Sequence, residues 1–336
     1  MVILVNVFGL INIRVSVFGS KKIVDTLHHE CYNDNTMHRH IIEYTTEANW
    51  LKARSADVTS TEVAALFGMS PYMTAYKLYH IKKGNLSSSF EESERMSWGK
   101  RLESSIAQGI ADEHNLEIRK MSEYIRLPDF RMGSSFDYAI GDKAILEIKN
   151  VGAESSKKWY LSDGKSAAPP HIELQCQYQL AVSGRETCYI GALFGGNRSV
   201  LIKRQRNEEL IVGIFEKVQT FWHMFDNCVE PEADVKTDSK TMLELNSYAE
   251  PGKMITGDED LEKLCSEYKK VSENETILQK QKNQLKALIL QRVGDAETAI
   301  VGKYTISAGL VAPAQVSYER KGYRLFKVSK KGGSDE

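Results

Sequence analysis

The sequence predicts a mixed α/β (α+β) core followed by a C-terminal extension with a long helical segment and a small β unit. Two observations lead to this prediction. Between residues 47 and 228, segments with helical spacing of apolar residues alternate with short runs of β-branched and aromatic residues. Beyond a polar stretch broken by Pro231, Pro251 and Gly252, apolar residues recur at alternating spacings of three and four, a heptad-like pattern.

These breaks divide the 336-residue chain into four parts. We expect an N-terminal segment of uncertain status over 1–36, the main domain over 37–230, a linker over 231–256 and the extension over 257–336. For the heptad-like pattern, an antiparallel helical hairpin is favoured over an intermolecular coiled coil. The basic tail of the extension is either a DNA contact or a solvated end.

Residues 1–19 are rich in Val, Ile and Phe, which favours a strand or hairpin. No basic region precedes this apolar run, and Asn6, Asn12 and Arg14 interrupt it, so neither a signal peptide nor a membrane anchor is expected. Two interpretations stay open. Either the segment belongs to the functional protein, or the natural product starts at Met37 and the residues before it contribute no function.

The main domain is expected to begin with helices. Thr59 to Glu62 form an N-cap cluster before an apolar run, Gly68 closes that helix, and Ser70-Pro71 opens the next. Gly141-Asp142 is predicted to be the turn of a hairpin. The expected helices are 47–53, 63–67, 70–79, 93–114, 171–183 and 207–227, and 87–89 is a loop. The expected strands are 117–121, 132–140, 144–151, 187–194 and 199–203, with strands of the extension near 304–306 and 316–318.

Composition narrows the class of protein. The net charge of −1 excludes a uniformly basic nucleic-acid binder, so any DNA contact needs positive charge gathered locally. The five cysteines are scattered and odd in number. This argues against a zinc ribbon, a disulfide framework and a four-cysteine cluster, and it favours a reducing cytoplasm.

Asp137, Glu147 and Lys149 form the candidate catalytic group. Glu147 and Lys149 are two residues apart in a predicted strand, so their side chains emerge on one face, and the turn brings Asp137 beside them. Two carboxylates, with the backbone carbonyl of Ile148, suit Mg²⁺, which would activate a water and stabilise charge on a phosphate. By itself, the pattern also fits a solvated hairpin face with a Glu–Lys pair.

Four blocks of sequence, in order, carry a resemblance to a known family. The chain resembles the phage lambda exonuclease / YqaJ-type viral recombinase family of PD-(D/E)xK nucleases over about residues 50–194. The blocks are WLKAR (50–54) with TSTEV (59–63) and LFGMSP (66–71), WGKRLE (98–103), GSSFD (133–137) with LEIK (146–149), and ELQCQYQLAVSG (173–184).

The resemblance implies a restriction-endonuclease-like core, with a central mixed β-sheet flanked by helices, and a set of catalytic residues. Asp137, Glu147 and the Ile148 carbonyl match the metal ligands, and Lys149 matches the catalytic lysine. Glu103 matches a helix-borne acid that can bind a second ion. Gln175 matches a glutamine that positions the lysine or the water, although Gln177 and Gln179 lie nearby.

The resemblance also implies a pocket for a 5′-phosphate. Arg54 matches the arginine that grips this phosphate, a role that suits a bidentate guanidinium. Thr61, where the family has serine, and Ser135 match the hydroxyls that line the pocket. Phe136 stands where the family often has proline, which changes the look of the motif more than its chemistry.

The implied activity is that of a Mg²⁺-dependent, ATP-independent 5′→3′ exonuclease that acts on duplex DNA ends and leaves 3′ overhangs for recombination by strand annealing. Two Mg²⁺ ions per site, with Mn²⁺ as a substitute, a ring-shaped homotrimer, a single-strand annealing partner and a phage or prophage origin are implied with it. No P-loop motif is present, in keeping with this. The alternatives are a restriction-like or nicking endonuclease on the same fold, and a catalytically decayed DNA-end-binding module.

Overall fold

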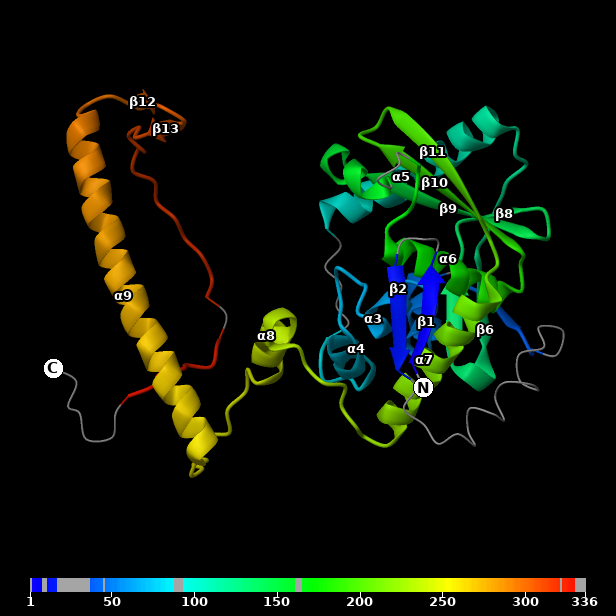
Figure 1. The fold of residues 1–336 in the computed structure, drawn as a ribbon, viewed down its shortest axis with the longest axis horizontal. Coiled ribbons are helices and arrows are strands. Elements are labelled where there is room, and N and C mark those ends of the chain that lie inside the picture. Colours follow the sequence, from blue (N-terminus) through cyan, green and yellow to red (C-terminus); the bar gives the residue numbers. More distant parts are fainter. Residues whose placement is uncertain are drawn as a thin grey trace. The chain divides into compact units, whose positions relative to one another are not determined.

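The computed structural model describes residues 2–7, 11–16, 37–44, 46–87, 93–160, 165–320 and 322–329. It divides into two units, Met1–Glu244 and Leu245–Glu336 (Figure 1). At the N-terminus, β1 (Val2–Val7) pairs antiparallel with β2 (Ile11–Ser16), so the predicted hairpin is confirmed. No helix among these residues is long and apolar enough to cross a membrane.

The first unit is built around a five-stranded mixed sheet with the order β11-β10-β9-β8-β5. β9 and β10 are parallel, while the remaining neighbours are antiparallel. The β8–β9 hairpin around Gly141 is the predicted one. The strands are β5 (Arg119–Lys120), β8 (Tyr138–Ile140), β9 (Ala144–Val151), β10 (Thr187–Phe194) and β11 (Arg198–Gln205).

A second sheet of four strands has the order β3-β6-β7-β4. β4 and β7 are parallel, with Thr59 opposite Gly133, and the other two pairs are antiparallel. The strands are β3 (His40–Glu43), β4 (Val58–Thr59), β6 (Glu123–Leu127) and β7 (Met132–Ser135).

Among the described residues of this unit, six α-helices precede α8, which is treated below. The helices are α2 (Glu47–Ser55), α3 (Val63–Leu66), α4 (Ala75–Lys82), α5 (Glu94–His114), α6 (Pro170–Ser183) and α7 (Glu208–Asp226). α6 lies in the crossover that joins the parallel strands β9 and β10. The mixed α/β core that the sequence predicts is therefore confirmed.

Strand alternation sorts the core into two faces of the five-stranded sheet. Leu146 and Ile148 of β9 pack with Ile106 and Ile110 of α5 in one cluster. Ile145, one residue out of phase, packs in a second and larger cluster that includes buried residues of α6 and α7. Because side chains alternate along a strand, Glu147 and Lys149 share the α6 side with Ile145.

The expectation of one strand over 132–140 is wrong. The chain leaves the four-stranded sheet after Ser135 and enters the five-stranded sheet at Tyr138. Asp137 causes the break, because its carboxylate accepts the Ile148 N–H and its carbonyl accepts the Met121 N–H. β6, which pairs with β7, was not predicted.

The start predicted at Ser70-Pro71 for the helix over 70–79 is also wrong. The Ser70 hydroxyl accepts the N–H groups of Tyr72 and Met73, which closes a turn. The helix α4 begins at Ala75 instead, where the Thr74 side chain caps it by accepting the Lys77 N–H.

The range predicted as a linker holds the helix α8 (Val235–Leu245). Its Asp238 is buried and accepts a 2.5 Å hydrogen bond from the Thr74 hydroxyl. Most of this segment therefore packs with the first unit, and the boundary between the units falls at Glu244.

The second unit contains one long helix, α9 (Glu259–Val293), and a hairpin of β12 (Thr298–Val301) with β13 (Tyr304–Ser307). A helical and small β extension is thus confirmed. The expected helical hairpin is wrong, because no glycine or proline interrupts the 35 residues between the Asp258 and Gly294 caps. The strand expected near 316–318 is not formed, and Lys330 and Lys331 of the basic tail lie outside the described residues.

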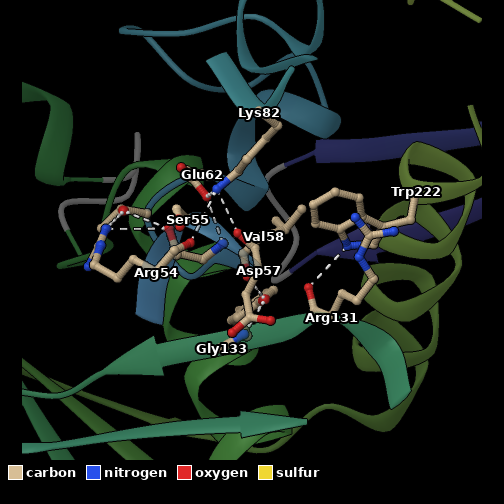
Figure 2. Close-up of polar contacts among 12 residues, drawn as sticks. Arg54, Ser55, Asp57, Val58, Glu62, Lys82, Arg131, Gly133 and Trp222 are labelled. Carbon is tan, nitrogen blue, oxygen red and sulfur yellow. Dashed lines mark hydrogen bonds and ion pairs between the residues drawn. The ribbon is translucent and has the colours of Figure 1, made fainter. Parts of the chain in front are cut away.

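Gly133 of β7 is the point where backbone and side chains approach most closely in the second sheet. The fully buried Asp57 lies beside it (Figure 2). Asp57 accepts hydrogen bonds from Arg126 (2.7 Å) and Tyr124 (3.1 Å). A Cβ at this position would stand 2.1 Å from the Tyr124 oxygen and 2.7 Å from Asp57 Oδ2.

We therefore expect Gly133→Ala to lower the free energy of unfolding by about 1–3 kcal/mol, because overpacking forces buried groups apart. Urea unfolding followed by circular dichroism measures this. The matched control is Gly109→Ala on α5, where a Cβ meets no atom within 4 Å. It should be neutral or stabilising by up to about 1 kcal/mol. Equal effects of the two substitutions would contradict the packing described here.

Candidate active site

Glu147 lies at the centre of the candidate site, on the middle strand β9, with only 5% of its surface exposed. Its Oε1 accepts hydrogen bonds from Lys149 Nζ (2.7 Å) and Gln175 Nε2 (2.6 Å). Its Oε2 accepts one from Gln179 Nε2 (2.7 Å). Since a buried carboxylate is stable only when paired and hydrogen-bonded, these three groups keep Glu147 in its place.

Lys149 and Gln175 are also joined to each other, because Lys149 Nζ donates to Gln175 Oε1 at 3.1 Å. Burial lowers the pKa of Lys149, but the charges of Glu147 and Asp137 outweigh it, so that the pKa lies above its usual value. Lys149 is therefore a fixed ammonium that donates hydrogen bonds, rather than a base.

The helix α6 presents Gln175 and Gln179 to the strand because they are four residues apart and share one face of the helix. Gln177 points elsewhere: it donates to the Gln205 carbonyl and accepts the Asn207 N–H. Gln175 and Gln179 therefore both contact Glu147, and Gln175 also contacts Lys149, while Gln177 contacts neither in the described hydrogen bonds. Gln179 was not among the residues predicted from the sequence. Helical spacing from Gln175 was the signal that could have found it.

Asp137 lies between β7 and β8, where its Oδ2 accepts the Ile148 N–H at 2.8 Å. This contact uses the N–H of Ile148, which is a different group from the Ile148 carbonyl that the sequence predicts as a metal ligand. Burial raises the pKa of Asp137 from its ordinary 3.8 to about 8, with further contributions from the negative charges of Glu147 and Glu103. Glu147 is thus close enough to Asp137 for its charge to oppose the ionisation of Asp137.

Glu103 approaches from the other side, on α5, and forms an ion pair with Lys120 of β5. Burial opposes the charge of Lys120, yet the hydrogen bond and charge of Glu103 raise its pKa overall. Because Glu103 still raises the pKa of Asp137, it belongs to the same electrostatic cluster. Its carboxylate is three-quarters buried.

The three acids Glu103, Asp137 and Glu147 fit a hard divalent cation by their chemistry. Carboxylate oxygens are the ligands that Mg²⁺ prefers. Besides burial, which is the largest cause, the negative charges of Glu147 and Glu103 raise the pKa of Asp137, so the three carboxylates lie in one electrostatic cluster. The fit is one of charge and donor type. Among the described residues no group of three His, Cys, Asp or Glu side chains is already arranged around a point that could hold a metal ion.

His171, at the start of α6, is a further residue that the sequence analysis did not select. Burial, together with the charges of Lys149 and Lys158, lowers its pKa to about 4, so the imidazole is neutral at pH 7. Its ring makes an edge contact with the exposed Tyr72, at 6.0 Å between centroids. A neutral ring pair therefore lies within electrostatic reach of Lys149.

A second group of polar residues surrounds Arg54, at the end of α2. Its Nη2 donates to Thr61 Oγ1 (3.1 Å) and Thr59 Oγ1 (3.4 Å), and its guanidinium lies over the Trp50 ring at 4.5 Å. Trp50 Nε1 in turn donates to Ser135 Oγ at 2.8 Å. We call these five residues the arginine pocket. It unites the predicted Arg54, Thr61 and Ser135 and adds Trp50 and Thr59.

Gln179 links the arginine pocket to the carboxylates. The amide that donates to Glu147 also donates to the Ser135 carbonyl at 3.3 Å. One side chain of α6 therefore connects the central strand β9 to the end of β7. Through Ser135 and Glu147, Gln179 thus joins the arginine pocket to the acid cluster.

The family comparison agrees with the blocks noted in the sequence. Residues 49–186 match the model of the YqaJ-like viral recombinase domain. We refer to residues 49–186 as the YqaJ-like domain because of this similarity. They include the three acids Glu103, Asp137 and Glu147, together with Lys149 and all five residues of the arginine pocket. The YqaJ protein of Bacillus subtilis strain 168 is 27% identical over 263 residues, which cover 76% of this chain and 81% of that protein.

Solved structures similar to this chain are more distant. The alkaline exonuclease LHK-Exo of Laribacter hongkongensis is 19% identical and covers 59% of this chain and 99% of its own, with a TM-score of 0.44. A phage-related exonuclease of Haemophilus somnus is 14% identical and covers 56% of this chain and 89% of its own, with a TM-score of 0.37.

The raised pKa of Asp137 predicts a dependence of stability on pH. Between about pH 4 and pH 8, the folded protein holds a proton on Asp137 that the unfolded chain has released. The carboxyl therefore lowers stability as the pH rises through this window. In metal-free buffer, we expect Asp137→Asn to gain stability relative to the parent as the pH rises from 5 to about 8.

Urea unfolding of both proteins across this range measures the difference. Asp142→Asn, in the exposed turn of the same hairpin, is the control for losing a carboxylate at the surface, and it should change stability little. A difference between parent and Asp137→Asn that stays constant from pH 5 to pH 9 would show that Asp137 ionises normally.

Proposed function

We propose that the YqaJ-like domain is a metal-dependent deoxyribonuclease that degrades linear duplex DNA from 5′-phosphorylated ends, in the 5′→3′ direction and without ATP. The observation that carries the proposal is the juxtaposition of Glu147, Lys149 and Asp137 with the arginine pocket through Gln179. An acid cluster suits hydrolysis of a phosphodiester, and a nearby cationic pocket suits the end of the strand.

The pocket is suited to an anion. Among the described residues, the Arg54 guanidinium pairs with no carboxylate; its recorded contacts are two hydroxyls and an aromatic ring. A guanidinium can donate two parallel hydrogen bonds to a phosphate, and the hydroxyls of Thr59 and Thr61 add further donors. A terminal phosphate carries more charge than an internal one, so an end is favoured over an interior position.

Asp137 and Glu147, with Glu103 for a second ion, would hold Mg²⁺ or Mn²⁺. The chemistry that such a cation would supply, if bound, is a lowered pKa of a water and an offset of the charge on the scissile phosphate. Lys149 would remain an ammonium. It would donate a hydrogen bond either to the water, which it would orient, or to a phosphate oxygen, whose charge it would offset. Gln175 holds Lys149 in position, since it contacts both Lys149 and Glu147.

The reaction explains why a pocket for a 5′-phosphate is useful at every step. Water adds to the phosphorus, the bond from phosphorus to the 3′-oxygen breaks, and the 3′-oxygen leaves with a proton. The products are a 5′-mononucleotide and a strand shortened by one residue that again ends in a 5′-phosphate. The group that the arginine pocket binds is thus regenerated in each cycle.

The family resemblance extends the proposal to the assembly. We propose a ring-shaped homotrimer around the duplex and a single-strand annealing protein that takes over the 3′ overhang. A ring needs positive charge only along its channel, which agrees with the net charge of −1. These features concern the whole protein and are independent of the chemistry at Glu147.

Digestion of linear duplexes labelled at either end, with and without a 5′-phosphate, tests the activity and its direction. With Mg²⁺, we expect mononucleotides from 5′-phosphorylated ends, slower digestion of 5′-hydroxyl ends, and no products in the presence of a chelator. Cleavage of covalently closed circular duplex would favour the endonuclease alternative. Tight DNA binding without any hydrolysis would favour the decayed end-binding module.

Lys149→Met in the same assay separates the catalytic group from a contaminating nuclease. We expect a loss of at least about a hundredfold in rate, since a positioned donor at the reacting phosphate is removed. The control is Lys143→Met, which breaks the exposed ion pair of Lys143 with Glu186 in the same hairpin and should leave the rate unchanged. A Lys149→Met protein as active as the parent would disprove the mechanism.

A further inference from the structure

A buried ion pair lies next to the arginine pocket, and neither of its residues belongs to the group of Glu103, Asp137, Glu147 and Lys149. Lys82, the last residue of α4, pairs with Glu62 at 3.0 Å, and their side chains are only 5% and 18% exposed. Figure 2 shows the Lys82 side chain reaching toward Glu62 and the backbone of Asp57, while the Arg54 side chain points away from it. Breaking such a pair leaves an uncompensated buried charge.

The pair contacts two of the backbone segments that carry the arginine pocket, the end of α2 and the start of β4. Lys82 Nζ donates to the carbonyls of Asp57 (2.6 Å) and Arg54 (3.4 Å), at the start of β4 and the end of α2. Glu62 Oε2 accepts the N–H of Thr59 at 2.8 Å. Lys82 and Glu62 therefore fix the backbone that carries Arg54 and Thr59, although neither side chain makes a recorded contact with the guanidinium.

The charges matter as much as the shape. Glu62 directly follows Thr61, whose hydroxyl accepts a hydrogen bond from Arg54. It is the acid closest in sequence to the pocket, and its carboxylate would compete with a phosphate for the guanidinium. In the structure, this carboxylate is instead neutralised by Lys82.

We propose that Lys82 is a positioning residue for recognition of a terminal 5′-phosphate: it keeps Glu62 neutralised and so leaves Arg54 available to the phosphate. The proposal rests on the proposed function, in that the anion is the end of a DNA strand. Lys82 touches neither the phosphate nor the reacting atoms. It acts through Glu62 and through the carbonyls of Arg54 and Asp57.

The test compares the dissociation constants of two short duplexes, one with 5′-phosphates and one with 5′-hydroxyls, in a chelator so that no hydrolysis occurs. Their ratio is the phosphate preference of a protein. We expect the parent to prefer the phosphate by about tenfold or more, as for a charge-assisted hydrogen bond. Lys82→Gln, which keeps a donor but removes the charge, should bring the preference close to one.

Removal of the second partner distinguishes an electrostatic role from a merely structural one. In Lys82→Gln/Glu62→Gln the competing carboxylate is gone, while the side chain at 62 still accepts the Thr59 N–H, so most of the preference should return. Lys82→Arg, which retains the charge, should keep it. Lys143→Met, which removes an exposed lysine from another ion pair, is the control for general loss of positive charge.

Each outcome decides a separate point. A parent without phosphate preference would overturn both the end recognition in the proposed function and this inference. A parent with the preference and a Lys82→Gln variant that retains it would overturn the inference alone, as would a double variant that stays without preference. Should Lys82→Gln fail to fold, Lys82→Arg and the double variant decide, and loss of preference in either overturns the inference.

Discussion

The structure depends on one constraint: a charged carboxylate, Glu147, lies in the middle of the central strand, where almost no water reaches it. Such a charge costs several kcal/mol to bury unless polar groups surround it. Lys149, Gln175 and Gln179 do so, and two of them come from α6. The position of α6 against β9 is therefore set by polar contacts as well as by the packing of its apolar residues. These contacts also fix how the crossover between β9 and β10 lies against the sheet.

The same helix relates the two sheets to each other. Gln179 reaches from Glu147 to the Ser135 carbonyl, and Tyr178 accepts the Gly133 N–H and donates to the Val58 carbonyl. Strands β4 and β7, which carry Thr59 and Ser135 of the arginine pocket, are thus held by the helix that also holds Lys149. A terminal phosphate in the pocket and a phosphodiester at the carboxylates would be placed by one rigid element, which is the precision that positioning of reactants requires.

Part of this arrangement follows from the sequence. The alternation in β9 predicts that Glu147 and Lys149 share a face, and helical spacing predicts α5, α6 and α7. Gln175, Arg54 and Thr61 were found only through the family resemblance, because nothing in their local pattern separates them from surface residues. The break at Asp137 could not be predicted, since it depends on a contact with Ile148, eleven residues away. The single helix α9 was missed because heptad-like spacing fits one long helix as well as two short ones.

The proposed catalysis requires that Glu103, Asp137 and Glu147 form a cation site and are not simply a buried polar cluster. Titration of the protein with Mn²⁺, followed by electron paramagnetic resonance of the free ion, tests this most directly, because the readout is independent of DNA and of turnover. We expect the parent to bind Mn²⁺ and Asp137→Asn and Glu147→Gln each to lose most of this binding. Mn²⁺ binding that is undiminished in both variants, or absent from the parent, would contradict this expectation.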